Sequence, residues 1–299
     1  MGKIKYITVG AVADIWQISE RSVRNYCAQG RIEGALLEGK TWKIPSTAEK
    51  PDRKPRHSST EETLLAFLKR EKEAGLKGGI YHKIQIDLTY NSNHIEGSKL
   101  THDQTRYIFE TKTIGVTDKA VKVDDIVETV NHFRCIDLII EGANTRLSES
   151  FIKQLHFILK SGTSDSQKSW FRVGDYKMLE NEVGGSDTTK PAEVAAAIKA
   201  LLKEYNSKSR ISFDDILDFH VRFESIHPFQ DGNGRVGRLI MFKECLKHNI
   251  VPFIITEELK MYYYRGIKNW KDERGYLRDT CLTGQDEMKR ELDYFGIKY

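Results

Sequence analysis

Apolar residues recur every three or four positions along most of the chain after residue 60, which is the spacing of helices that bury one face. The pattern predicts amphipathic helices at about 61–76, 79–94, 101–112, 123–141, 148–161, 191–206, 212–225, 233–248, 257–270 and 284–296. A strand-like interruption lies at about 170–185, where glycines and polar residues break the helical spacing. We therefore expect a mainly α fold with one β-hairpin over residues 61–299.

Residues 1–46 have a different pattern. We expect a helix at about 10–16 and a second helix at about 19–29, separated by a short break. Two β-type runs at 32–37 and 41–44 then predict a hairpin. This order of elements is typical of a helix-turn-helix followed by a wing.

Composition and charge separate this first segment from the rest. Residues 47–60 are rich in Ser, Thr, Pro and basic residues and contain no large apolar residue, which predicts a linker. Residues 1–60 contain 11 Lys/Arg against 6 Asp/Glu, whereas residues 61–299 contain 36 against 37. The net charge of +4 therefore comes from the first segment, which is a mild indication of a nucleic-acid partner.

The segment at residues 1–46 is similar to the winged helix-turn-helix of the MerR and excisionase type, through its helix pair and its ending Gly-Arg-Ile…Trp-Lys-Ile-Pro. The resemblance implies that the second helix enters the major groove of DNA and that the wing lies near phosphates. The side chains implied to contact DNA are Arg21, Ser22, Arg24, Asn25, Lys40 and Lys43. The alternative is a small domain that binds protein or only stabilises the fold.

Residues 227–238 contain the most specific chemistry, with the sequence His-Pro-Phe-Gln-Asp-Gly-Asn-Gly-Arg-Val-Gly-Arg. Gly232, Asn233 and Gly234 favour a turn in which successive backbone N–H groups point at one spot. An apolar run follows, so the turn precedes a helix N-terminus, whose dipole attracts anions. The segment therefore suits a phosphate.

Four further side chains in this segment extend the expected phosphate site. Arg235 and Arg238 lie in the first turn of the expected helix, where cations are unfavourable unless an anion lies between them. Asp231 suits a Mg²⁺ ion that is held mostly by water and phosphate oxygens. Because His227 can accept a proton near neutral pH, the spacing predicts a polyphosphate site beside a base.

Residues 227–238 match the signature of the Fic family, His-Pro-Phe-x-Asp/Glu-Gly-Asn-Gly-Arg-x-x-Arg, at every fixed position, and the chain is thereby similar to that family. The resemblance implies a Fic-type helical domain at 61–299 that transfers AMP from ATP to a Tyr, Ser or Thr hydroxyl of a protein, with the chain itself as one candidate target. It implies that His227 is the base and that Asp231 holds Mg²⁺. The implied nucleotide-binding residues are Gly232, Asn233, Gly234, Arg235 and Arg238.

A helix expected at about 79–97 contains Ser92 and Glu96, four residues apart on one face. They resemble the inhibitory motif Ser/Thr-x-x-x-Glu-Gly/Asn of the Fic subclass that carries it N-terminal to the catalytic motif. The resemblance implies a bidentate pair between Glu96 and Arg238, which would occupy the guanidinium that should hold the terminal phosphate. ATP would then bind with its α-phosphate misaligned.

Two further stretches resemble parts of the same family. Residues 170–185 are similar to the flap, a hairpin that holds the target by main-chain pairing, with Lys177 where the family often has arginine. Tyr263 and Tyr264 resemble a tyrosine pair that contacts the nucleotide. Packing in the core is the alternative for both tyrosines.

Composition limits the class of protein. The four cysteines are far apart and form no C-x-x-C pair, so we expect neither a disulfide framework nor a zinc site. No apolar run approaches the roughly 18 residues that span a bilayer, and the first ten residues lack the apolar stretch of a secretory signal. We therefore expect a soluble cytoplasmic protein without a membrane partner, and a homo-oligomer stays open.

Other functions stay open beside AMP transfer. One is a DNA-binding transcriptional regulator whose Fic domain senses nucleotide or is held idle by Glu96. Others are a Fic enzyme that uses another donor, and one that removes AMP. The two arginines of the signature favour a triphosphate donor.

Overall fold

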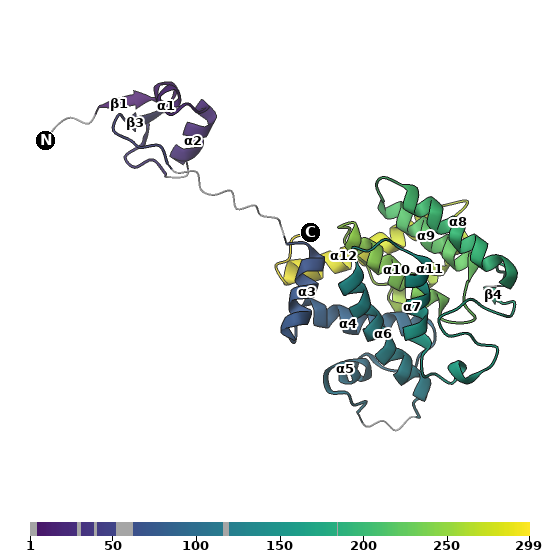
Figure 1. Cartoon of the computed structure of the whole chain (residues 1–299). Helices are drawn as coiled ribbons and strands as arrows, with labels where there is room; N and C mark the ends of the chain where they lie inside the picture. Colours follow the sequence, from purple (N-terminus) through teal and green to yellow (C-terminus); the bar gives the residue numbers. More distant parts are fainter. Residues whose placement is uncertain (1–4, 29–30, 39–40, 52–61, 116–119, 184) are drawn as a thin grey trace. The chain divides into compact units, whose positions relative to one another are not determined.

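The computed structural model describes residues 5–28, 31–38, 41–51, 62–115, 120–183 and 185–299 (Figure 1). The chain divides into two compact units, Met1–Thr60 and Glu61–Tyr299. Each unit has a hydrophobic core of its own, and the large core lies in the second unit.

In the first unit, two helices pack on a small antiparallel sheet. The elements, in chain order, are β1 (Tyr6–Thr8), α1 (Val9–Trp16), α2 (Glu20–Ala28), β2 (Leu36–Glu38) and β3 (Thr41–Pro45). The strand order is β1-β3-β2. Val12, Val23 and Ile44 are buried and join α1, α2 and β3 into one core.

Strand β1 differs from expectation, because the apolar pattern predicts no strand before residue 32. It is three residues long and pairs with β3 from Tyr6–Pro45 to Thr8–Lys43. Three residues are too few to show the alternation of apolar and polar residues, so this strand is recognised only by its pairing with β3. The hairpin also starts later than expected, at Leu36, because Gly34 adopts a positive φ of 76° in a turn.

The second unit is a bundle of helices with one short hairpin. Its elements are α3 (Leu64–Ala74), α4 (Ile80–Ile95), α5 (His102–Thr111), α6 (Val123–Gly142), α7 (Glu149–Lys160), η1 (Asp165–Gln167), β4 (Glu182–Val183), β5 (Ser186–Asp187), η2 (Pro191–Glu193), α8 (Val194–Ser207), α9 (Phe213–Ile226), α10 (Asn233–Lys247), α11 (Glu257–Lys268) and α12 (Gly275–Tyr294). The mainly helical fold class is thereby confirmed.

Helix α10 forms the centre of this unit. Every residue from 235 to 246 is buried, and the helix packs against α3, α4, α6, α7 and α9 (Figure 1). This burial explains why apolar residues surround the helix rather than lie on one face, and Arg235, Arg238, Lys243 and Glu244 are buried as well. The loop before α10 therefore leads directly into a fully buried helix.

Two boundaries differ from expectation in the second unit. Helix α12 begins at Gly275 rather than near 284. Gly284 resembles a helix boundary in the sequence, but it lies inside α12, where a Cβ atom would come within 2.7 Å of the Ile254 carbonyl oxygen. The β-hairpin pairs residues 182–183 with 186–187, at the end of the expected range.

Candidate active site

The loop between α9 and α10 is closed by its own side chains. His227 ends α9 in a left-handed conformation, with φ at 49°. Gly232 has φ at 82° and precedes the first residue of α10. The Asn233 side chain bonds both backbone groups of Phe229, its Oδ1 accepting from the N–H at 2.8 Å and its Nδ2 donating to the carbonyl at 2.8 Å. Asn233 is buried and its side chain shapes the loop, while its contact with a nucleotide stays a prediction.

His156 on α7 packs against this loop. Its ring stacks on Phe229 with centroids 3.9 Å apart, and its Nε2 lies 3.2 Å from the Asp231 carbonyl oxygen. Its Nδ1 accepts from the Gly174 N–H at 2.9 Å, so Nε2 carries the proton. Burial lowers the pKa of His156 to about 3, and the ring is neutral.

Asp231, the expected metal ligand, is paired with two cations. Its Oδ2 accepts from Lys160 Nζ at 2.7 Å and from Arg235 Nη2 at 3.1 Å. Burial would raise the pKa of this carboxyl, but the charges of Arg235 and Lys160 outweigh it and hold the pKa well below the usual range. The side chain is nevertheless half-exposed, at 50%. Asp231 is therefore an ionised carboxylate with solvent access.

Arg235 does not present a free guanidinium as the sequence suggested. Its side chain is buried and is paired with Glu128 on α6 as well as with Asp231. Glu128 also accepts from Lys160 Nζ at 2.6 Å. The anions that offset Arg235 at this helix N-terminus are thus protein carboxylates, so Arg235 fixes the position of Asp231.

Arg238 points to the other side, toward the end of α4. Its Nε donates to Ser92 Oγ at 3.0 Å, and its Nη2 donates to the Ser92 carbonyl at 2.9 Å and to Glu96 Oε1 at 2.7 Å. The expected bidentate pair is therefore a single hydrogen bond from Arg238 to Glu96, because Ser92 takes the Nε side of the guanidinium. A Cβ atom at Gly234 would collide with Glu96 Oε1, so glycine is needed where the glutamate reaches α10.

His227 is neutral and largely enclosed. Its side chain is 17% exposed, and its buried Nδ1 has no hydrogen-bond partner among the described residues. Burial, and then the charge of Lys177, lower the pKa of His227 to about 4. The imidazole is therefore unprotonated, as a general base has to be, throughout the physiological pH range.

The expected flap is fastened to the loop by three hydrogen bonds. Lys177 N donates to the Pro228 carbonyl at 2.9 Å, Asn181 Nδ2 to the Phe229 carbonyl at 3.1 Å, and Leu179 N to Gln230 Oε1 at 3.2 Å.

Lys177 itself is buried inside the flap. Its Nζ donates to Asn181 Oδ1 at 2.6 Å and to Thr188 Oγ1 at 2.5 Å, and burial lowers its pKa to about 8. Lys177 thus holds the flap together from within.

The two tyrosines after the loop differ in exposure. Tyr263 is buried, and its hydroxyl lies 2.5 Å from His220 Nε2, so its ring packs in the core and its nucleotide contact stays a prediction. Tyr264 is 42% exposed and stays a candidate. Both lie on α11, where residues 263 and 264 point in directions about 100° apart, so one packs inward and the other outward.

The expected DNA-contacting residues in the first unit are described only in part. Arg24 is paired with Glu20 on the same helix at 2.5 Å. Lys43 is half-buried on β3. Lys40 and the side chains of Arg21, Ser22 and Asn25 lie outside the described part of the structure.

Sequence reasoning missed three charged residues of the site, namely Glu128, Lys160 and Glu224. Charged residues on amphipathic helices are ordinarily exposed to solvent, and none of these three residues belongs to a recognisable short motif. Their burial depends on which helices pack together. For Lys160, one available signal is its place at the end of the expected helix 148–161, close to a polar loop.

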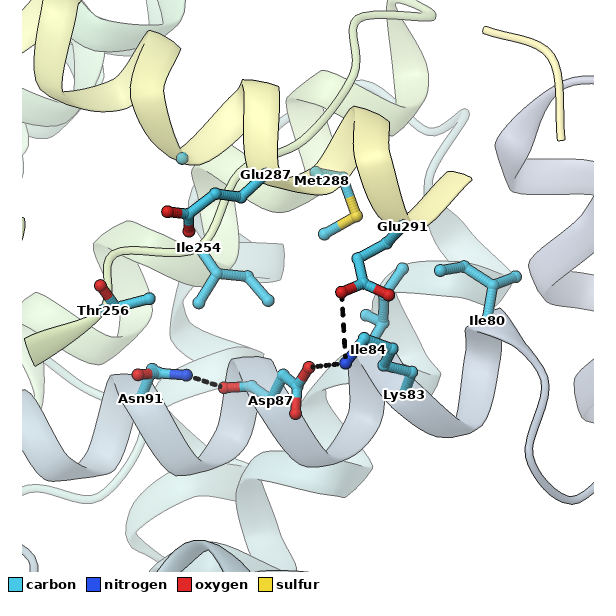
Figure 2. A pocket seen from close by; sticks show the side chains of 11 residues that line it. Ile80, Lys83, Ile84, Asp87, Asn91, Ile254, Thr256, Glu287, Met288 and Glu291 are labelled. Atoms are coloured by element: carbon cyan, nitrogen blue, oxygen red, sulfur yellow. Dashed lines mark hydrogen bonds and ion pairs between the residues drawn. The ribbon is translucent and has the colours of Figure 1, made fainter. Parts of the chain in front are cut away.

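A separate pocket of about 100 Å³ lies between α4 and α12 (Figure 2). Ile84, Ile254 and Met288 contribute apolar side chains, and Lys83 bonds Asp87 at 2.9 Å and faces Glu291 at 3.6 Å. None of its lining residues belongs to the loop 227–238.

Among the described residues, no helix has the length and apolar character needed to cross a bilayer.

Known proteins are similar to this chain in sequence and in fold. Residues 146–245 match the model of the Fic/DOC family. A protein adenylyltransferase Fic from Aedes aegypti is 26% identical over 244 residues, which are 80% of this chain and 45% of that protein. One from Drosophila grimshawi is 26% identical over 223 residues, or 71% and 42%. The chain thus spans less than half the length of these curated relatives.

Solved structures similar to the chain are also Fic proteins. A Fic domain containing signaling protein from Bacteroides thetaiotaomicron has a TM-score of 0.61 and 23% identity, over 77% of this chain and 94% of that chain. Fic-1 from C. elegans has a TM-score of 0.59 and 17% identity, over 78% and 72%. The chain therefore has a Fic-like fold, and residues 146–245, which contain the loop 227–238, match the Fic/DOC family model.

Proposed function

We propose that the chain is a protein adenylyltransferase that transfers AMP from ATP to a hydroxyl group of a protein. The observation that carries the proposal is the loop 227–238, which brings an imidazole, a carboxylate and a helix N-terminus together and lies inside the Fic/DOC match. Relatives that match over most of this chain are named protein adenylyltransferase Fic. ATP and a hydroxyl-bearing protein are the substrates that follow.

In this mechanism His227 is the general base. It accepts the proton of the target hydroxyl while the oxygen attacks the α-phosphorus of ATP. A bond forms between that oxygen and phosphorus, the bond from phosphorus to the β-phosphate oxygen breaks, and pyrophosphate leaves with the electron pair. The lowered pKa of His227 keeps the ring neutral and ready to accept the proton.

The first turn of α10 supplies the phosphate site. Gly232 and Gly234 leave the backbone N–H groups at the helix N-terminus open to an anion, since neither residue carries a side chain. Arg238 would hold the phosphates that become pyrophosphate once Glu96 leaves its guanidinium. Arg235 acts indirectly by fixing Asp231.

Asp231 fits the Mg²⁺ ion that ATP chemistry requires. Its half-exposed side chain is ionised, with Oδ2 held by Lys160 and Arg235, so it suits an ion that takes its other ligands from water and phosphate. When bound, Mg²⁺ neutralises phosphate charge.

We propose that α4 inhibits this site. The Glu96 carboxylate occupies Arg238 at 2.7 Å, and Ser92 fixes the same guanidinium through two more hydrogen bonds. A charge-assisted bond at a side chain this buried competes directly with a phosphate for the same donor.

Labelling with α-³²P ATP and Mg²⁺ tests both proposals. We expect Glu96→Gly to raise self-labelling by about 10-fold or more, and His227→Ala in that background to abolish it. Mass spectrometry of the labelled protein identifies the donor by the added mass. Absence of label from the Glu96→Gly protein with every nucleoside triphosphate would contradict the proposed transferase.

We further propose that the first unit is a DNA-binding winged helix-turn-helix. The packing of α1 on α2 and the β2–β3 hairpin favour it, as does the basic surplus of residues 1–60. If the full chain shifts DNA at low salt and loses the shift as salt rises, the proposal holds. A full chain that shifts no DNA at low salt would rule it out, and a DNA-bound protein without labelling would favour a regulator with an idle Fic domain.

A further inference from the structure

Glu224 is a buried carboxyl group beside the proposed base. It lies in the last turn of α9, three residues before His227, and its side chain is 11% exposed. Its Oε1 has no hydrogen-bond partner among the described residues. An unpartnered buried polar group destabilises the folded state, and it therefore calls for a functional explanation.

The neighbouring helix is shaped to keep this carboxyl in place. A Cβ atom at Gly237 on α10 would lie 2.7 Å from Glu224 Oε1 and 2.7 Å from His220 Cε1. Only glycine leaves room for both side chains. Gly237 occupies a variable position of the Fic signature, so the signature alone does not require a glycine there.

The second unpartnered group is His227 Nδ1, which lies 3.9 Å from Glu224 Oε2. The backbone carbonyl of Glu224 also faces the ring and raises its pKa, although no described atom meets hydrogen-bond geometry at Nδ1. Two buried groups that lack partners are thus adjacent. A carboxyl shift of about 1 Å would bring them into the range of about 2.6–3.2 Å in which a hydrogen bond forms.

We propose that Glu224 is a positioning residue for His227, whose carboxyl accepts a hydrogen bond from Nδ1–H and thereby keeps the ring lone pair on Nε2. A carboxyl oxygen accepts a hydrogen bond whether or not the group is ionised. Burial, with the nearby charge of Glu96, raises the pKa of Glu224 to about 8, so a mostly neutral group has to fulfil this role at pH 7. Its carbonyl oxygen can do so.

The contact between Glu224 and His227 does not depend on the proposed transferase function, but its effect on catalysis rests on that function. With Nδ1 protonated and held, Nε2 is the nitrogen that takes the proton of the target hydroxyl. The ring then becomes an imidazolium with both nitrogens protonated, and no proton moves to Glu224. If the other tautomer were dominant, Nε2 would already carry a proton and could not act as a base.

Nitrogen-15 NMR of the histidine rings in the full chain tests the geometry without any substrate. The His227 signals are assigned by their loss in His227→Ala. We expect the Nδ1–H tautomer in the unmodified chain, and a rise of the Nε2–H tautomer in Glu224→Leu. Glu224→Gln keeps the size of the side chain and an acceptor oxygen like that of the neutral carboxyl, so we expect the Nδ1–H tautomer to persist there.

Kinetics in the Glu96→Gly background provide the second readout. Glu224→Leu should lower kcat for labelling by about 10- to 100-fold with the KM for ATP unchanged, whereas Glu224→Gln should retain most of the kcat. Asp214→Asn removes the charge of an exposed carboxyl on the same helix and should change neither readout. A folded Leu variant that retains the Nδ1–H tautomer overturns the proposal, even if kcat falls. If no variant labels at all, the transferase proposal fails while the tautomer still decides the role of Glu224.

Discussion

Lys160 shows how much a single buried cation contributes to this site. Its side chain is 2% exposed, and Nζ contacts Glu128 at 2.6 Å, Asp231 at 2.7 Å and Asp165 at 3.0 Å. These carboxylates come from α6, the active-site loop and η1, so Lys160 joins three segments that are distant in the sequence. Removing one member of a buried ionic network leaves its partners buried without compensation, which usually costs several kcal/mol.

We expect Lys160→Met to lower the free energy of unfolding by about 3–5 kcal/mol, as measured by urea denaturation. The matched control is Lys168→Met, which removes one bond to the same Asp165 from a side chain that is 45% exposed. Exposed pairs contribute about 1 kcal/mol or less, so this control should change little. Equal effects of the two substitutions would show that the burial of Lys160 is unimportant.

At the scale of elements, the flap depends on its attachment to the loop 227–232. Gln230 occupies a variable position of the Fic signature, yet its Oε1 accepts from Leu179 N at 3.2 Å. Asn181 forms a second attachment through the Phe229 carbonyl and also accepts from Lys177 Nζ. The flap is thus positioned by side chains of both segments, in addition to the backbone bond of Lys177.

We expect Asn181→Ala to increase amide hydrogen exchange over residues 177–182 by about 5-fold or more, because it removes hydrogen bonds that each contribute about 1 kcal/mol. Exchange mass spectrometry measures this directly. Asn206→Ala, which removes a bond to the Leu147 carbonyl, serves as a control and should leave the flap unchanged. Unaltered exchange in Asn181→Ala would mean that the backbone bond to Pro228 is sufficient.

At the scale of the whole molecule, burial of several imidazoles links stability to pH. Burial lowers the pKa of His132, His156 and His220 to about 3 each and that of His227 to about 4. Unfolding exposes these rings, which then titrate near 6.5. As pH falls below this value, the unfolded state binds protons that the folded state does not, so the folded state loses stability. Glu224 acts in the opposite direction, because its raised pKa favours the folded state at lower pH.

We therefore expect the free energy of unfolding to decrease by roughly 5 kcal/mol between pH 7 and pH 5, since the four histidines outweigh Glu224. Urea denaturation of the full chain at several pH values tests this. His132→Gln should reduce the slope, whereas His102→Gln, at a side chain that is 48% exposed, should not. A stability that stays constant or rises toward pH 5 would contradict the prediction.

The positions of the helices and of the loop could be predicted from local patterns. Apolar spacing fixed the helices of the second unit to within a few residues, apart from α12, where Gly284 resembled a boundary. The glycines of the loop and the apolar run after it predicted a turn before a buried helix, and α10 is that helix. These features depend on interactions between residues close in sequence, which a single sequence records.

Only the tertiary structure decided the partner of each charged side chain. It placed Glu128 and Lys160 around Asp231, divided the two arginines between α6 and α4, and gave Glu96 one bond to Arg238 where two were expected. It also buried Tyr263 beside His220 and paired β1 with β3. Periodicity predicts which face of a helix is buried. The partner on that face can lie about a hundred residues away in the sequence, and it follows from the packing of whole helices.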